Sequence, residues 1–262
     1  LRLLIVAVTL AVAALTAVGF FADRLKGGLQ RDARQLLGGD AVVSSDNPTP
    51  EAFIAKAREM GLTVAGTLSF PTMGRAPDAS GGASKLVALK VVEPGYPLRG
   101  SLKITRQPGT PETSTRDIPA AGEAWVDAPL LESLGLKMGD TLLLGDASFR
   151  ISTVIVIEPD RGAGFMNFAP RVMINRADVD ATKLIQPASR LTYRMAVAGT
   201  DAQVKRFVDW ADVEIKSRAV RGLRVESLEG GRPEMRQTLD RAEKFLNLVA
   251  LLAALLSAVA VA

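Results

Sequence analysis

The run LLIVAVTLAVAALTAVGFF occupies residues 3–21 and contains no charged residue. With a rise of about 1.5 Å per residue, a helix of about 19 residues is about 28 Å long, close to the roughly 30 Å hydrocarbon core of a bilayer. A second apolar run occupies Phe245–Ala262. The two runs predict that residues 1–22 form a first transmembrane helix and that residues 241–262 begin a second one.

A cleaved signal peptide is the alternative interpretation of the first run. That run is longer than the roughly 7–15 apolar residues of a signal-peptide core, and only Ala14 and Ala17 are weak candidates for a cleavage site. A secreted protein also has no need of the second run. Because the chain starts at Leu1 and stops within the second run, we expect it to be a piece of a longer protein.

The composition excludes several classes of function. The net charge is +4, and Lys and Arg are scattered among acidic residues with only 5% aromatic residues, so a nucleic-acid surface is not expected. The chain has no His and no Cys, which excludes Ser-His-Asp and Cys-His nucleophilic sites and ordinary zinc sites. There is no G-x-x-x-x-G-K-[ST] loop for ATP. We therefore expect no catalytic, cofactor-binding or metal-binding residue, and no enzyme activity, in this chain.

Acidic residues near expected turns are the remaining candidates for chemistry. Asp127, Asp140, Asp146 and Asp160 follow one another along the central part of the sequence. Asp is common in turns and helix caps because its carboxylate accepts hydrogen bonds from nearby backbone N–H groups. Turn and cap hydrogen bonds are therefore the favoured role for these acids, rather than acid-base catalysis.

Residues 23–240 are predicted to form one α+β domain with a helical stalk at each end. The first stalk continues the apolar run to Leu37 and ends at Gly38-Gly39. Gly27-Gly28 weaken the helix midway and mark either a kink or the point where it leaves the membrane. The second stalk begins at Arg232. Between them, short helices are expected at Pro50–Met60 (capped by Thr49), at Pro129–Leu134 and after Thr200. Strands are expected at Ala41–Ser44, Leu62–Phe70, Lys85–Glu93, Ser101–Thr105, Ala124–Asp127, Thr141–Leu144, Ser148–Ile157, Arg171–Ile174, Arg190–Ala198 and Leu223–Ser227, and loops at 71–84, 94–100 and 107–119.

One segment carries a family resemblance. Leu134-Gly-Leu-Lys-Met-Gly-Asp-Thr141 combines a helix end at Gly135 with a tight turn at Gly139-Asp140, and Glu158-Pro159 follows the next hairpin. This arrangement resembles the extracytoplasmic domain of FtsX/MacB-like ABC transporter permeases. The segments 21–25 and 165–175 resemble the YbbP-type branch of the family, and residues 241–262 look like the start of the family's membrane module.

The resemblance implies a permease subunit in the bacterial inner membrane, with residues 23–240 in the periplasm and a fold of the MacB-like type. It also implies a partner ATPase subunit, a periplasmic partner protein and a lipid or other hydrophobic envelope substrate. The helical extensions Asp23–Leu37 and Arg232–Lys244 would transmit movement from the membrane to the periplasmic domain. The simpler interpretation is that the two extensions are amphipathic stalks that pack together for stability.

Two other classes share the layout of span, domain and span. A membrane-bound sensory receptor would bind a small ligand in its periplasmic domain and would continue into a cytoplasmic signalling domain. A membrane-anchored envelope enzyme is disfavoured because His and Cys are absent. The sequence after Ala262 distinguishes permease from receptor, since a permease would continue into further spans.

Overall fold

The computed structural model describes residues 2–162, 168–186, 189–218 and 222–227, and also residues 241, 244, 245, 248, 249 and 252. The chain has two compact units, one formed by Arg34–Ser227 and the other by Leu1–Ala33 with Leu228–Ala262. Among the described residues, no helix combines the length and the hydropathy needed to cross a membrane. Most of the predicted extension Arg232–Lys244 and most of the second apolar run lie outside the described residues. Both predicted spans stay predictions.

Helix α1 runs without a break over Arg2–Leu37. The predicted helical extension from Asp23 to Leu37 is thus confirmed. Gly27 and Gly28 are both helical and do not interrupt it. The helix ends where predicted. Gly38 has a φ of 72°, in the left-handed region that glycine adopts without steric cost, and its N–H bonds Gln35 O at 3.0 Å.

The unit Arg34–Ser227 is built on a single sheet. Among the described residues, eleven strands pair in the order β11-β1-β10-β2-β3-β9-β6-β8-β4-β5, with β7 between β2 and β8. The strands are β1 (Ala41–Ser45), β2 (Thr63–Arg75), β3 (Ser84–Val92), β4 (Leu102–Thr105), β5 (Thr113–Thr115), β6 (Glu123–Asp127), β7 (Thr141–Leu144), β8 (Ala147–Ile157), β9 (Arg171–Asn175), β10 (Thr192–Ala198) and β11 (Arg224–Ser227). The predicted α+β class is confirmed.

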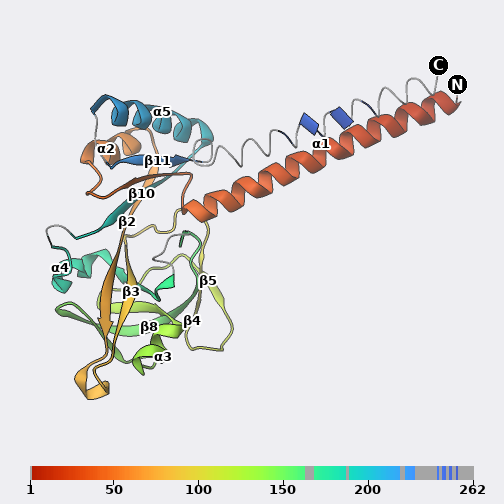
Figure 1. Ribbon diagram of the computed structural model, residues 1–262. Helices are drawn as coiled ribbons and strands as arrows, with labels where there is room; N and C mark the ends of the chain where they lie inside the picture. Colours follow the sequence, from red (N-terminus) through yellow and green to blue (C-terminus); the bar gives the residue numbers. More distant parts are fainter. Residues whose placement is uncertain are drawn as a thin grey trace. The chain divides into compact units, whose positions relative to one another are not determined.

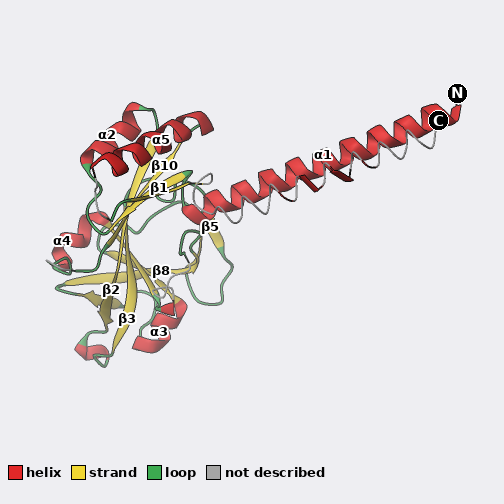
Figure 2. Cartoon of the chain, turned by 45° about the horizontal axis from the view of Figure 1, so that its top comes forward, coloured by secondary structure: helices red, strands yellow, loops and turns green. Residues whose placement is uncertain are grey.

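One end of the sheet, β11-β1-β10-β2, carries two helices, and we call this part the helix half (Figures 1 and 2). Helix α2 covers Glu51–Glu59 and helix α5 covers Asp201–Arg218. Alternate strand residues such as Ala41 and Val43 point into the core below the helices, as the two-residue period of a strand requires. Phe53 of α2 and Trp210 of α5 join the helices, with ring centroids 5.0 Å apart.

The other part of the sheet closes on itself, and we call it the ring half. Strands β2, β3, β9, β6, β8 and β7 pair in succession, and the pairing of Gly74 with Leu144 returns β7 to β2. The ring encloses a separate apolar core that includes Leu89, Val126 and Phe149. Helix α3, Ala128–Leu134, adds three leucines to that core and ends at Gly135 in the left-handed conformation, as predicted. Strand β2 belongs to both halves.

The structure corrects several predicted boundaries. The segment 71–84, predicted as a loop, continues β2 through Pro71 to Arg75 and forms only a short 3₁₀ turn at Asp78–Ser80. Pro71 faces Ala88 of β3, but Ala88 directs its N–H to Pro170 O, so this pair of residues exchanges no ladder bond. On the other side of β2, β10 pairs only as far as Ser69 and β7 only from Gly74, so the missing N–H of Pro71 leaves no ladder bond unmade. Three smaller corrections are the N-cap of α2 at Pro50 instead of Thr49, strand β5, and helix α4 at Val179–Thr182.

Candidate functional site

A buried group of charges lies on the outer face of the ring half. Along β3, Leu89 and Val91 point into the ring core, and the alternation turns Lys90 and Val92 to the opposite face. Val92 joins a small apolar cluster with Trp125 and Met173, and Lys90 is only 3% exposed. A buried lysine is rare unless it is paired. The surroundings of Lys90 therefore mark a specialised site.

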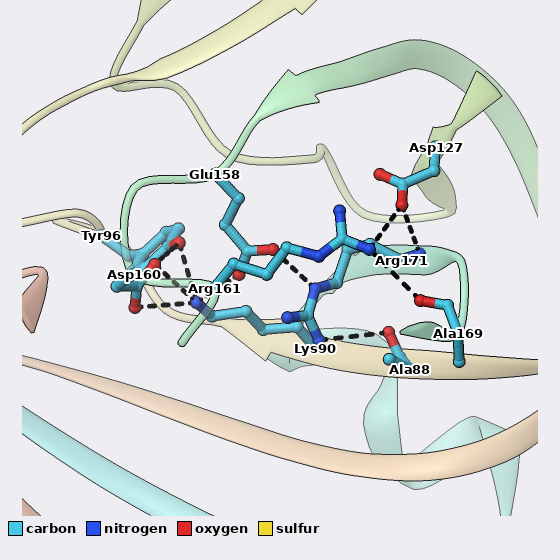
Figure 3. A network of polar contacts seen from close by, with 9 residues as sticks. All are labelled: Ala88, Lys90, Tyr96, Asp127, Glu158, Asp160, Arg161, Ala169 and Arg171. Carbon is cyan, nitrogen blue, oxygen red and sulfur yellow. Dashed lines mark hydrogen bonds and ion pairs between the residues drawn. The ribbon is translucent and has the colours of Figure 1, made fainter. Parts of the chain in front are cut away.

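Lys90 is surrounded by acceptors, and Figure 3 shows the contacts. Its Nζ donates to Glu158 Oε1 at 2.7 Å, to both carboxylate oxygens of Asp160 at 2.8 Å, and to Tyr96 Oη at 2.9 Å. The Tyr96 hydroxyl donates to Asp160 Oδ1 at 2.5 Å, and the ammonium lies 4.4 Å from the Tyr96 ring centroid. The three N–H donors of the ammonium thus bond to acceptors on three residues.

Arg171 supplies the second positive charge opposite the two carboxylates. Its Nε donates to Glu158 Oε2 at 2.6 Å, and its backbone N–H donates to Asp127 Oδ2 at 2.9 Å. We call Lys90, Tyr96, Glu158, Asp160 and Arg171 the ionic cluster; it holds two cations and two carboxylates. Asp127 also accepts from Arg161 Nη2 at 2.8 Å, which extends the network along the edge of the ring (Figure 3).

Electrostatics favour the charged, paired form of the cluster. Burial by itself raises the pKa of Asp160, but the charge and hydrogen bonds of Lys90, with the hydrogen bond from Tyr96, outweigh burial and leave this pKa below its ordinary value of 3.8. Burial, together with the nearby charges of Asp160 and Glu158, raises the pKa of Tyr96 well above 10.0. Tyr96 therefore stays a neutral donor and Asp160 stays an ionised acceptor at neutral pH.

The cluster borders the end of helix α1. A Cβ added to Gly38 would lie 3.1 Å from Asp160 Oδ2, so the carboxylate of the cluster packs directly against the residue that terminates the helix. Tyr96 reaches the cluster from the segment between β3 and β4. Three residues further along that segment, the backbone N–H of Arg99 bonds Gly38 O at 3.2 Å. Gly38 is thus held on two sides by residues of the ring half.

A second buried carboxylate, Asp40, lies two residues beyond Gly38. Arg99 binds it with two donors, Nε at 2.9 Å from Oδ1 and Nη2 at 2.6 Å from Oδ2. The N–H of Gly199, after β10, donates to Oδ2 at 3.0 Å. Arg34, in the last turn of α1, lies with Nε 3.5 Å from Asp40 Oδ1 and donates from Nη2 to Asp201 Oδ1 of α5 at 2.7 Å.

The buried charged groups pair with one another. The charges of the ionic cluster are satisfied by one another, and its members are at most 6% exposed. Within the described residues, no group of three His, Cys, Asp or Glu side chains is placed to hold a metal ion. The ionic cluster fixes the geometry of the segments that supply its members, namely β3, the segment between β3 and β4, the segment after β8, and β9.

The four acids considered from the sequence have different roles. Asp140 behaves as predicted, since its Oδ2 accepts from Lys137 N at 2.8 Å within the turn. Asp160 belongs to the ionic cluster and Asp127 pairs with Arg161, so the turn-and-cap role is wrong for these two. Asp127 precedes α3 but makes no side-chain cap hydrogen bond. At Asp146 the backbone N–H bonds Thr182 O at 3.0 Å.

Sequence reasoning missed the basic members of the site. One signal was present: Lys90 interrupts the apolar run Leu86–Val92, where a buried strand would not leave a charge without a partner. For Arg99 and Arg171 no such signal exists, because each lies at the edge of an element, where Arg is ordinarily solvated.

Comparison with curated proteins places the chain beside ABC transporter permeases. It is 36% identical over 256 residues to a protein described as an uncharacterized ABC transporter permease of Escherichia coli (strain K12), and the match covers 98% of the chain. The predicted resemblance to this permease family is confirmed. The particular relative is YbbP, the type already indicated by the sequence. The chain spans 30% of the length of YbbP.

Two solved structures show a weaker likeness, and no family model matches the chain. The periplasmic region of MacB from Actinobacillus actinomycetemcomitans has a TM-score of 0.46 at 9% identity, covering 79% of this chain and 95% of that one. The extracellular domain of the noncanonic ABC-type transporter YknZ from Gram-positive bacteria has a TM-score of 0.44 at 12% identity, covering 71% and 100%. Scores of this size do not establish a common fold.

Proposed function

We propose that the chain is part of the membrane subunit of an ABC transporter, and that a separate ATPase subunit hydrolyses the ATP. The observation that carries the proposal is the 36% identity to the YbbP permease over nearly the whole chain. The same relationship supports the permease over the sensory receptor, the other class with this layout. The MacB-like type of the folded unit is part of the proposal.

The membrane location is proposed from helix α1. Its residues 3–21 form an uncharged apolar run, and several of its large apolar side chains are more than half exposed, namely Ile5, Val12, Phe20 and Phe21. Exposed apolar side chains in such a continuous run are stable against lipid but not against water. We place residues 1–22 and 241–262 in the bacterial inner membrane and residues 23–240 in the periplasm.

The proposed work is mechanical. Movement of the membrane spans, driven by the ATPase, would pass along α1 and the extension Arg232–Lys244 to the folded unit, which acts on a lipid or other hydrophobic envelope substrate with a periplasmic partner protein. Support comes from the length of α1, Arg2–Leu37, and from the buried charges that hold its last turn. A helix is a stiff element along its own axis, so displacement at one end reaches the other.

Co-purification tests the partner. The full-length permease, extracted in mild detergent, is expected to retain an ATP-binding subunit and to show ATP hydrolysis that is lost when the catalytic residues of that subunit are changed. The present chain alone is expected to hydrolyse no ATP. Robust turnover by the chain alone, or a purified permease that retains a kinase-like signalling partner in place of an ATPase, would contradict the proposal.

A further inference from the structure

The last turn of α1 is attached at the boundary between the two halves of the folded unit. Arg34 reaches Asp201, the first residue of α5, and so contacts the helix half. Gly38 contacts Asp160 and Arg99, which follow strands of the ring half. The attachment of α1 within Arg34–Ser227 therefore involves both halves.

Asp40 is the group on which these attachments converge. Its two oxygens accept from Arg99, which belongs to the segment leaving β3, and from the backbone N–H of Gly199, which follows β10. Its own N–H donates to Val197 O at 2.8 Å. Asp40 is 3% exposed, and its carboxylate connects three parts of the chain. It binds the ring half through Arg99 and the helix half through Gly199, and it belongs to the segment that directly follows α1.

Polar contacts join the last turn of α1 to the folded unit. Leu36, in the last turn of α1, is 59% exposed, whereas the polar groups around it are engaged with the folded unit. Arg194 Nη2 reaches Leu37 O at 3.5 Å. Arg34 Nε is buried and forms no hydrogen bond within the described structure, although it lies 3.5 Å from Asp40.

We propose that Asp40 is a positioning residue: together with Arg99 and Arg34 it fixes the last turn of α1 to both halves, so that a movement of α1 displaces both. This inference rests on the proposed function for the source of the movement. It assigns the coupling to one buried carboxylate, whereas a role in stability alone would leave the coupling unchanged once a variant is folded.

The experiment uses pairs of spin labels in the full-length permease with its ATPase, reconstituted in lipid nanodiscs. The chain has no cysteine, so cysteines are introduced at Leu36, on the last turn of α1, and at Val213 of α5 or Met73 of β2, after removal of any elsewhere in the permease. All three side chains are about half exposed or more. Distances are measured with and without ATP and for three variants.

Asp40→Asn is the principal variant, and Arg99→Lys keeps the positive charge but loses the two-point contact. Asp78→Asn, in the exposed Arg75–Asp78 pair of the 3₁₀ turn, is the matched control. Without ATP, we expect the distance distributions of Asp40→Asn to broaden at least twofold, those of Arg99→Lys to broaden less, and those of Asp78→Asn to match the parent. With ATP, the parent distances shift, and the shift falls by at least half in Asp40→Asn.

The widths of the distance distributions without ATP test the role of Asp40, and the shift in distance on adding ATP to the parent tests the proposed function. If ATP leaves the parent distances unchanged, the proposed transmission is wrong, and the nucleotide-free widths still decide whether Asp40 positions the helix. If the parent responds and folded Asp40→Asn responds equally with unbroadened distances, the role of Asp40 is wrong. Should Asp40→Asn fail to fold, Arg99→Lys decides: parent-like widths and an undiminished ATP response would overturn the inference.

Discussion

Lys90 shows how one buried charge commits several segments to one arrangement. Its ammonium holds Glu158 and Asp160 from the segment after β8, and Tyr96 from the segment after β3. Removing one member of such a buried set leaves the opposite charges without compensation, which costs more than the set contributes as a whole. The cluster therefore restricts which conformations the segments can adopt, even where its net contribution to stability is small.

Replacing Lys90 tests this view. Lys90→Met keeps the apolar stem and removes the charge, so the free energy of unfolding is expected to fall by about 3–5 kcal/mol. Urea unfolding followed by tryptophan fluorescence measures the change, with Trp125 reporting on the ring half and Trp210 on the helix half. The control is Lys56→Met, which breaks an exposed pair with Glu59 and should cost less than about 1 kcal/mol. Equal losses in the two variants would contradict the role given to the cluster.

Tyr96 makes the free energy of unfolding depend on pH in the alkaline range. Its pKa in the folded chain lies above 10.0, whereas an unfolded tyrosine ionises near that value. The unfolded state therefore loses this proton first, and the stability contributed by Tyr96 is present below pH 10 and is lost as pH rises beyond it. The slope amounts to at most about 1.4 kcal/mol per pH unit.

We expect Tyr96→Phe to weaken this alkaline loss. Unfolding free energies measured between pH 9 and about pH 11.5 should decline less steeply in the variant than in the parent, because the group that titrates has been removed. Tyr193→Phe is the matched control for loss of a tyrosine hydroxyl elsewhere in the chain. Parallel curves for Tyr96→Phe and the parent would show that Tyr96 ionises equally in both states.

At the scale of elements, the end of α1 depends on Gly38. A side chain there meets two costs: a φ of 72° costs an L-residue about 1 kcal/mol, and a Cβ would lie 3.1 Å from Asp160 Oδ2. Gly28 in the same helix has a helical conformation and no atom within 4 Å of an added Cβ. The same substitution therefore has opposite consequences ten residues apart.

Gly38→Ala is expected to lower the unfolding free energy of the folded unit by about 1–2 kcal/mol. Gly28→Ala is expected to raise the helicity of α1, since Ala exceeds Gly in a helix interior by about 0.5–1 kcal/mol. Urea unfolding and circular dichroism measure the two effects. A neutral Gly38→Ala would mean that the helix end is free to move away from Asp160.

Local sequence signals predicted most helices and strands. They missed the strand segments that form only because a neighbouring strand pairs with them. Gly135 ended α3 as predicted, and the Thr200 hydroxyl accepts from Gln203 N at 3.4 Å as a cap. The segment 71–84 was predicted as a loop, yet β2 and β3 stay paired as far as Arg75 and Ser84, because each strand supplies hydrogen-bond partners for the other. Strand β5 likewise exists because β4 lies beside it.

At the scale of the whole molecule, the predicted α+β class was within reach of the sequence, but the closed ring was not. Closure requires β7 to return to β2 across a separation of more than sixty residues, and no short-range pattern encodes that pairing. The same holds for the site, because its members come from segments as distant as Asp40 and Asp160. The acids were visible in the sequence, whereas their partners became identifiable only through the fold.

The proposed membrane orientation predicts accessibility from one side. A single cysteine at Ala79, exposed in the 3₁₀ turn between β2 and β3, should react with a membrane-impermeant maleimide in cells whose outer membrane alone is permeabilised. The parent without the added cysteine is the control. Labelling that needs lysis of the inner membrane would place the folded unit in the cytoplasm and contradict the periplasmic location.

The pairing of β1 with β11 has a consequence for how the gene could have been assembled. Ala41 at the start of the folded unit lies opposite Ser227 at its end, as Cα partners in an antiparallel ladder, and such partners are about 5 Å apart. A unit whose entry and exit points adjoin can be gained, exchanged or deleted as an insertion while the flanking segments keep their connection. Recombination at these two points would therefore allow the same flanking segments to carry different inserted domains.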